Sequence, residues 1–449
     1  MKPTPIRRDQ TSLFSSFEDQ LDHNNPIFKL ANLIDWQMFE REFTPLYSSK
    51  PSRPAKPIRL MVGLLILKHV RNISDESVVE QWSENSYYQY FCGYPSFVPS
   101  FPCDASELVH FRKRIGERGI ELILQESIRV NQEHNDDDKN GGGTAFIDAT
   151  VQEKNITYPT DAKLHKKIIK KCKDIAKEEN LPMRQSYTRT LKKLSIDQRF
   201  RNHPKNYKKA QKADKKVKTI AGRLVRELER NLSEDSPRRK ELELYNRILQ
   251  QRRNSKDKIY SIHEPEVECI SKGKEHKKYE FGNKVSIIRT MEGLIIGALS
   301  FRKEYDGHTV EKSLEQTERI AGYRPNKLAG DRGYRGRKWY ETTELVIPSS
   351  PSAQDSRYQK EKKRKLFRKR AAIEPIIGHL KSDHRLNLNF YKGLFGDAIN
   401  VMLAAAAFNF KRAMAFLWLY ICSYMLNVSS YIIAKIRSRK ITEIGFARF

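Results

Sequence analysis

The chain has 449 residues, of which 38% are hydrophobic and 10% aromatic, a composition typical of a globular protein and not of a disordered one. Its formal net charge of +29 favours a polyanionic partner: nucleic acid first, then an anionic membrane or a ribosome-like structural role. The five cysteines lie far apart without a Cys-x-x-Cys pair, which argues against a disulfide framework or structural zinc and favours a reducing cytoplasm.

Residues 1–138 are expected to form a helical N-terminal domain for DNA binding or dimerisation, because apolar residues recur there at helical spacing. One helix should end near 72–74, and a later one should begin at Asp104 or shortly after it. On that later helix we expect Arg112 and Lys113 to point outward. A DNA-binding face and a merely solvated basic face both remain open for them.

A polar, glycine-rich stretch at 134–143 predicts a domain boundary. Beyond it, five apolar runs indicate strands, and one amphipathic run between the third and the fourth indicates a helix. The strands are expected at TAFIDATVQ, YEFGNKVSIIRT, GLIIGALSFR, NKLAGD and ELVIPSS, and the helix at HTVEKSLEQTERIAGY. This order predicts a mixed α/β core built from residues 139–162 and 259–395.

Residues 163–258 should form a basic helical insertion within that core. They contain 31 lysines and arginines against 12 acidic residues, which is most of the excess charge of the chain. Pairing of acids and bases four residues apart could make this segment a solvated hairpin. The acids are too few to neutralise it, so an arm that binds the phosphate backbone is favoured.

Residues 396–449 are expected to form hydrophobic C-terminal helices. The stretch 413–434 carries no charge over about 22 residues, long enough to span a membrane. Its polar residues and the lack of a second span favour a buried or partner-covered helix, so no membrane partner is expected.

Three acidic residues occupy unusual places. Asp148 interrupts an apolar strand, where an unpaired charge would cost several kcal/mol. Asp331 directly follows a strand, as site residues do in α/β sheets, although many such aspartates only cap turns. Glu374 lies among basic and apolar residues, so it is either half of a surface ion pair or a metal ligand. Pro375 predicts a kink or a helix start at this point.

Taken together, these segments resemble bacterial insertion-sequence transposases of the DDE class, in the insertion-sequence-five group. The matching pieces are FIDATVQEKNITYPTD, ISKGKEHKKYEFGNKVS, AGDRGYRG and RKRAAIEPIIGHLK. The related insertion-sequence-four group carries a signature Tyr-(2)-Arg-(3)-Glu-(6)-Lys. Arg370, Glu374 and Lys381 match it, and Phe367 stands where tyrosine is expected. On one continuous helix these four side chains would form a single stripe.

The resemblance implies an RNase H-like catalytic core, with a mixed five-stranded sheet, in which Asp148, Asp331 and Glu374 are the catalytic triad. Three carboxylates suit two hard ions, Mg²⁺ or Mn²⁺, that promote cleavage and rejoining of phosphodiesters. Asp148 would bridge both ions, and the other two acids would hold one each. No histidine- or cysteine-rich cluster is needed for this chemistry.

Further residues near the three acids are expected to contact DNA. Arg370 and Lys381 should hold phosphates near the scissile bond, and Tyr334 and Arg335 should touch bases or backbone. The expected partners are double-stranded DNA, as inverted-repeat ends and target, and a second copy in a synaptic homodimer in the bacterial cytoplasm. The alternatives are a non-catalytic DNA-binding protein, either architectural or a degenerate transposase, and a nuclease without joining activity.

Overall fold

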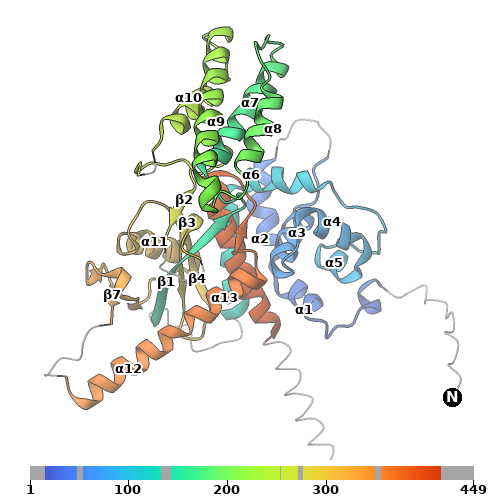
Figure 1. The fold of residues 1–449 in the computed structure, drawn as a ribbon. Coiled ribbons are helices and arrows are strands. Elements are labelled where there is room, and N and C mark those ends of the chain that lie inside the picture. Colours follow the sequence, from blue (N-terminus) through green and yellow to red (C-terminus); the bar gives the residue numbers. More distant parts are fainter. Residues whose placement is uncertain are drawn as a thin grey trace, which may run out of the picture. The chain divides into compact units, whose positions relative to one another are not determined.

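The computed structural model describes residues 16–47, 54–132, 143–252, 254–271, 277–348 and 355–415 (Figure 1). The chain forms two compact units. The first unit consists of residues 1–152, 284–389 and 395–449, and the second of residues 153–283 and 390–394. The N-terminal helices therefore belong to the same compact unit as most of the sheet. Most of the predicted apolar segment 413–434 lies outside the described residues.

The N-terminal part of the first unit is helical, as predicted. Its helices are α1 (Pro26–Leu33), α2 (Trp36–Phe43), α3 (Ile58–Val70), α4 (Asp75–Glu84), α5 (Ser86–Phe91) and α6 (Ala105–Gln132). The side chain of Ser74 caps α4 by accepting a hydrogen bond from the Ser77 backbone N–H, and Asp104 accepts one from the Ser106 N–H at the start of α6. Nearly every residue of α3 is buried, so this helix is the centre around which the others pack.

The sheet is mixed, which confirms the predicted α/β class. Its strands are β1 (Thr144–Lys154), β2 (Glu268–Ile270), β3 (Glu280–Arg289), β4 (Ile295–Phe301), β5 (Lys327–Ala329), β6 (Trp339–Tyr340), β7 (Thr343–Val346) and β8 (Leu388–Asn389). The order is β2-β3-β1-β5-β7-β6, with β4 beside β3 and β8 beside β1. All five predicted strands are present. The three additional strands have two or three residues each, too few to show a periodicity.

Helix α11 (Val310–Ala321), the helix predicted between the third and fourth strands, packs on β4. Two buried side-chain amides satisfy backbone groups of β4 that would otherwise lack partners. Asn409 pairs with both the N–H and the C=O of Ile295, at 3.0 and 2.8 Å, and Gln316 does the same for Ala298, at 3.0 and 3.2 Å. This edge of the sheet is thereby closed by side chains instead of a further strand.

The helix Gly393–Ala415, which carries Asn409, is the one helix among the described residues that is long and apolar enough to cross a membrane. However, 72% of its most apolar 18-residue window is buried inside the protein. Buried asparagines at positions 400 and 409 are hydrogen-bonded to the sheet. As far as it is described, this helix therefore serves as a core helix and does not indicate a membrane protein.

The second unit contains the helices of the basic insertion: α7 (Asp161–Glu178), α8 (Thr188–Asp197), α9 (Pro204–Asn231) and α10 (Arg239–Gln250). One apolar stripe of each helix faces a common core that includes Cys172, Val217, Leu224 and Ile248. Most lysines and arginines of α9 lie on the opposite, exposed side. The long basic segment is therefore an independently packed helical unit.

Candidate active site

Strands β1 and β5 run parallel, and their register bears on two of the predicted acids. Thr144 pairs with Lys327, and Phe146 pairs with Ala329. Continued by two residues, the same register sets Asp148 beside Asp331 on neighbouring strands, which are about 4.8 Å apart. Because both positions lie two residues beyond a paired position, their side chains leave the sheet on the same face.

Asp148 lies in β1 with its side chain 17% exposed. One carboxylate oxygen, Oδ1, accepts a hydrogen bond from the Ala149 backbone N–H at 2.8 Å. The other, Oδ2, lies 3.5 Å from Nη1 of Arg370, which is 16% exposed. The carboxylate on the strand therefore faces a cation supplied by a distant segment of the chain.

Asp331 follows β5 and is partly buried. The strand continues one residue past its assigned end, since the Gly330 N–H donates to the Val346 carbonyl of β7 at 3.0 Å. Asp331 then caps the short 3₁₀ turn Arg332–Tyr334 by accepting a hydrogen bond from the Gly333 N–H at 2.8 Å. One carboxylate oxygen is thus held by the loop.

Glu374 begins a new helix. Helix α12 (Arg357–Ala371) ends before Ala372, and α13 (Ile373–Asp383) places Glu374 and Pro375 in its first turn. Proline is tolerated there because first-turn N–H groups have no partner within the helix. The predicted helix start is therefore confirmed. The predicted stripe is divided, with Phe367 and Arg370 on α12 and Glu374 and Lys381 on α13.

A small apolar cluster joins the segments that carry the three acids. Phe146, Ala329 and Ile373 contact one another, and none of them is exposed to solvent. Each lies one or two residues before one of the acids: Asp148, Asp331 or Glu374. Since these side chains pack against each other, the backbones of β1, β5 and α13 meet at one place in the first unit. The Glu374 side chain itself is exposed.

The carboxylates do not form a preassembled metal cluster. Among the described residues, no group of three or more His, Cys, Asp or Glu side chains is arranged to hold a metal ion. The segments that carry the acids meet, but the side chains of two of the acids are engaged otherwise: Asp148 with Arg370, and Asp331 with its own loop. The arrangement offers oxygen donors without holding them in a closed coordination shell.

Arg289 is a residue of this site that sequence reasoning did not identify. It ends β3 and is 3% exposed, with its guanidinium 4.5 Å from the centre of the Phe146 ring. It also donates hydrogen bonds to the carbonyls of Thr290, at 3.0 Å, and Lys369. Burial lowers the pKa of Arg289. In the sequence, only its place at the end of the otherwise apolar run VSIIR could have indicated this role. In the structure, Arg289 links the end of α12 to the strand that carries Asp148.

The burial of two residues contradicts the prediction that they contact DNA. Tyr334 has no exposed surface, so it has none to offer to DNA. Burial, followed by the negative charge of Asp148, raises the pKa of Tyr334 well above its usual range. Arg112 is 3% exposed and holds Asp75 with two hydrogen bonds, at 2.9 and 2.8 Å. Arg335 and Lys113 are exposed, as expected.

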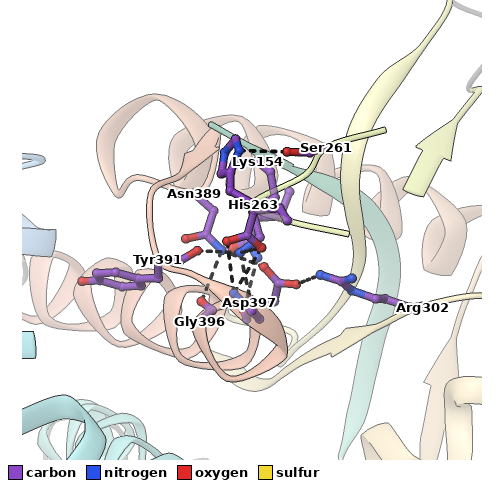
Figure 2. Close-up of polar contacts among 11 residues, drawn as sticks. Lys154, Ser261, His263, Arg302, Asn389, Tyr391, Gly396 and Asp397 are labelled. Atoms are coloured by element: carbon purple, nitrogen blue, oxygen red, sulfur yellow. Dashed lines mark hydrogen bonds and ion pairs between the residues drawn. The ribbon is translucent and has the colours of Figure 1, made fainter. Parts of the chain in front are cut away.

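Other buried charged groups of the first unit have structural partners. Asp397, which is 1% exposed, is paired with Arg302 and accepts a hydrogen bond from Asn389 at 2.9 Å (Figure 2). A carboxylate enclosed and neutralised in this way holds the C-terminal helix against the sheet. It is not available to a ligand.

The second unit has a comparable anchor at its start. Lys154, which is 3% exposed, donates to the Tyr391 carbonyl at 2.5 Å (Figure 2) and lies 3.5 Å from Glu264. Glu264 in turn accepts a hydrogen bond from the Gly393 N–H at 3.1 Å. These contacts connect segments of the unit that are far apart in sequence.

Comparisons with known proteins agree with the architecture. Residues 15–114 match the family described as Transposase domain (DUF772), and residues 261–410 match the Transposase DDE domain. The second match includes Asp331 and Glu374, and Asp148 lies before it. The chain is 39% identical over 195 residues to a protein of Rhizobium meliloti called "Uncharacterized protein ORF8 in nfe locus", covering 42% of this chain and 94% of that protein. No solved structure matches the chain.

The match to the Transposase DDE domain, on a mixed α/β core, identifies the protein as an enzyme that catalyses DNA strand transfer. The chain belongs to the DDE transposases of bacterial insertion sequences. Its substrate is therefore DNA, and divalent metal ions are the typical cofactors of its family.

Proposed function

We propose that this transposase binds the terminal inverted repeats of an insertion sequence and cleaves and transfers DNA strands with Asp148, Asp331 and Glu374. The parallel register of β1 and β5 supports this assignment above all, because it brings two of the acids to neighbouring strands. The apolar contact of Ile373 with Phe146 and Ala329 supports the third. In this proposal the core is RNase H-like and the protein belongs to the insertion-sequence-five group.

The donor set fits Mg²⁺ or Mn²⁺, because hard divalent ions prefer carboxylate oxygens and share their coordination with water and phosphate. Asp148 is already opposite a cationic side chain, so its surroundings accommodate positive charge. Two such ions, when bound, would activate the attacking hydroxyl group or water and stabilise the leaving oxygen. Asp148, Asp331 and Glu374 would hold them, and the exposed Glu374 side chain is free of the enclosure that fixes Asp397.

The basic residues around the acids have a separate task in this proposal. Arg370 and Lys381 would bind phosphates flanking the scissile bond, and the exposed Arg335 and Lys113 would add backbone contacts. Two transposon ends must be held together for transfer, so we propose that the active species is a homodimer in the bacterial cytoplasm, associated with the nucleoid.

The test uses the full-length protein and a linear fragment that carries one end of the element. Asp148→Asn, Asp331→Asn and Glu374→Gln should each abolish Mg²⁺-dependent cleavage, a loss of at least about a thousandfold. Each should retain DNA binding in a mobility-shift assay. Glu292→Gln removes an exposed carboxylate in the β3–β4 turn of the same unit and should leave both activities unchanged. Strand transfer at the wild-type rate by any of the three variants would refute the triad.

A further inference from the structure

Helix α12 has a feature that the active-site chemistry does not require. Nine of its fifteen residues are lysine or arginine, only Glu361 is acidic, and none is buried. Every residue from 356 to 365 is exposed, so nearly three turns of helix have no apolar contact face. In Figure 1, α12 extends away from the sheet that carries β1 and β5. Soluble helices normally bury one stripe, and this one does not.

Helix α12 is stabilised by contacts at its two ends. Ser356 and Gln359 form a reciprocal capping box at the N-terminus, with hydrogen bonds of 3.2 and 2.9 Å. At the C-terminus, Leu366 packs against the apolar cluster, and Arg289 donates to the Lys369 carbonyl. In between, like charges four residues apart repel each other and are opposed by one pair within the helix, Glu361–Lys365 at 3.0 Å. Such a helix gains stability when a polyanion surrounds it.

The positive charge encircles the axis. At about 100° per residue, Lys360 and Arg364 share one side, and Lys362 and Lys369 lie roughly 170° away from them. All four side chains are exposed, and none forms an ion pair with a described residue. A helix that rests on a DNA backbone needs basic residues on one side only. Charge on opposite sides fits a helix with phosphates on both flanks, as in the major groove, whose width of about 12 Å admits one helix.

We propose that α12 inserts into the major groove of duplex DNA next to the cleavage site. The inference deepens the proposed function and rests on it for the position of that site. Arg370 at the end of α12 contacts Asp148. Lys360 lies ten residues, or about 15 Å, further along the helix. This length corresponds to roughly four to five base pairs, so α12 occupies the groove within that distance of the scissile phosphate.

The test measures binding of full-length protein to end DNA without divalent metal, over a series of salt concentrations. Lys360→Gln/Arg364→Gln and Lys362→Gln/Lys369→Gln should each weaken binding on the order of tenfold and reduce the salt slope by about one to two. Glutamine preserves helix propensity, and all four positions are exposed, so the fold should be unchanged. Glu361→Gln removes the only acid of α12 and should tighten binding. An effect confined to one of the two double variants would place α12 on the outside of the duplex and overturn the inference.

Two further readouts separate the alternatives. Wild-type protein should protect guanine N7 from dimethyl sulfate within about five base pairs of the cleavage site, and both double variants should lose this protection. Duplex RNA has a major groove too narrow for a helix, so its binding should change little in the variants. An equal loss on RNA would indicate a general polyanion contact and refute groove insertion. Because these assays need no catalysis, they give an answer even if the triad variants remain active.

Discussion

The ion pair between Asp75 and Arg112 allows a direct test of whether the charge of Arg112 stabilises the fold or binds DNA. The Asp75 carboxylate forms ion pairs with Lys68 Nζ at 2.7 Å and with Arg112 Nη2 at 2.8 Å. Both cationic side chains are only 4% exposed. Asp75→Asn removes the negative charge and leaves two buried cations without it. Removing one partner of a buried pair typically costs about 3–5 kcal/mol. We therefore expect Asp75→Asn to lower the free energy of unfolding by that amount.

The pKa of Asp75 gives a second route to the magnitude. Burial alone would raise this pKa, but hydrogen bonds and charges from Arg112 and Lys68 outweigh it and lower the value from 3.8 to about 2. Because the folded state releases the proton more readily, the stabilisation is present above pH 3.8 and is lost as the pH falls through about 2. The shift corresponds to roughly 2–3 kcal/mol at neutral pH. This is of the same order as the cost of the substitution.

The assay is urea denaturation of the full chain together with hydrogen exchange of the amides in α3, α4 and α6. Arg112→Gln should destabilise the same helices and leave the DNA affinity of the folded protein unchanged. As a control, Glu42→Gln breaks an ion pair with Arg41 in which the Arg41 side chain is 71% exposed and the Glu42 side chain 45%. This substitution should lower the free energy of unfolding by less than about 0.5 kcal/mol. A stable Arg112→Gln variant with weakened DNA binding would refute the structural role of Arg112.

Two further predictions concern the active site and the pH dependence. Gly330→Ala sets a new Cβ 3.0 Å from the Tyr334 ring and 3.2 Å from Ile147, so it should shift Asp331 and cut cleavage at least tenfold while DNA binding persists. Gly336→Ala, with 3.7 Å of clearance, should match wild type. Burial lowers the pKa of His384 to about 4, so the unfolded state binds the proton first and stability should fall by about 3 kcal/mol from pH 6.5 to 4. Urea midpoints measured across this pH range should decrease less in His384→Gln than in the wild type. An equal decrease in the variant would contradict the assignment of this pH dependence to His384.

Local pattern predicted the strands well because each of the five longer runs has a composition and length that favour β-structure on its own. The helix start at Glu374 was also readable, since Pro375 restricts the backbone whatever surrounds it. Arg112 shows where the reading failed. It lies four residues after Leu108 and three before Ile115, on the buried stripe of α6, and its charge led us to place it outside. Its counterion is 37 residues away, so no local pattern announces it.

The burial of Tyr334 and the presence of Arg289 in the site were not predicted, for a related reason. Whether a tyrosine in a polar loop or an arginine at a strand end is enclosed depends on what the rest of the chain stacks against it. Gly330 lies against the Tyr334 ring, and Phe146 lies under Arg289. These contacts join segments that are remote in sequence, so they form only when the sheet assembles.

The sequence by itself determined the basic character of the chain, the identity and order of Asp148, Asp331 and Glu374, and the strands and helices that carry them, because composition and backbone preference are local properties. Only the tertiary structure decided that β1 and β5 pair in a register that aligns two of the acids, that Arg370 faces Asp148, and that residues 356–365 of the basic α12 segment are all exposed. Register and burial depend on which distant segments meet, and the free energy that selects those meetings comes from packing of the whole unit.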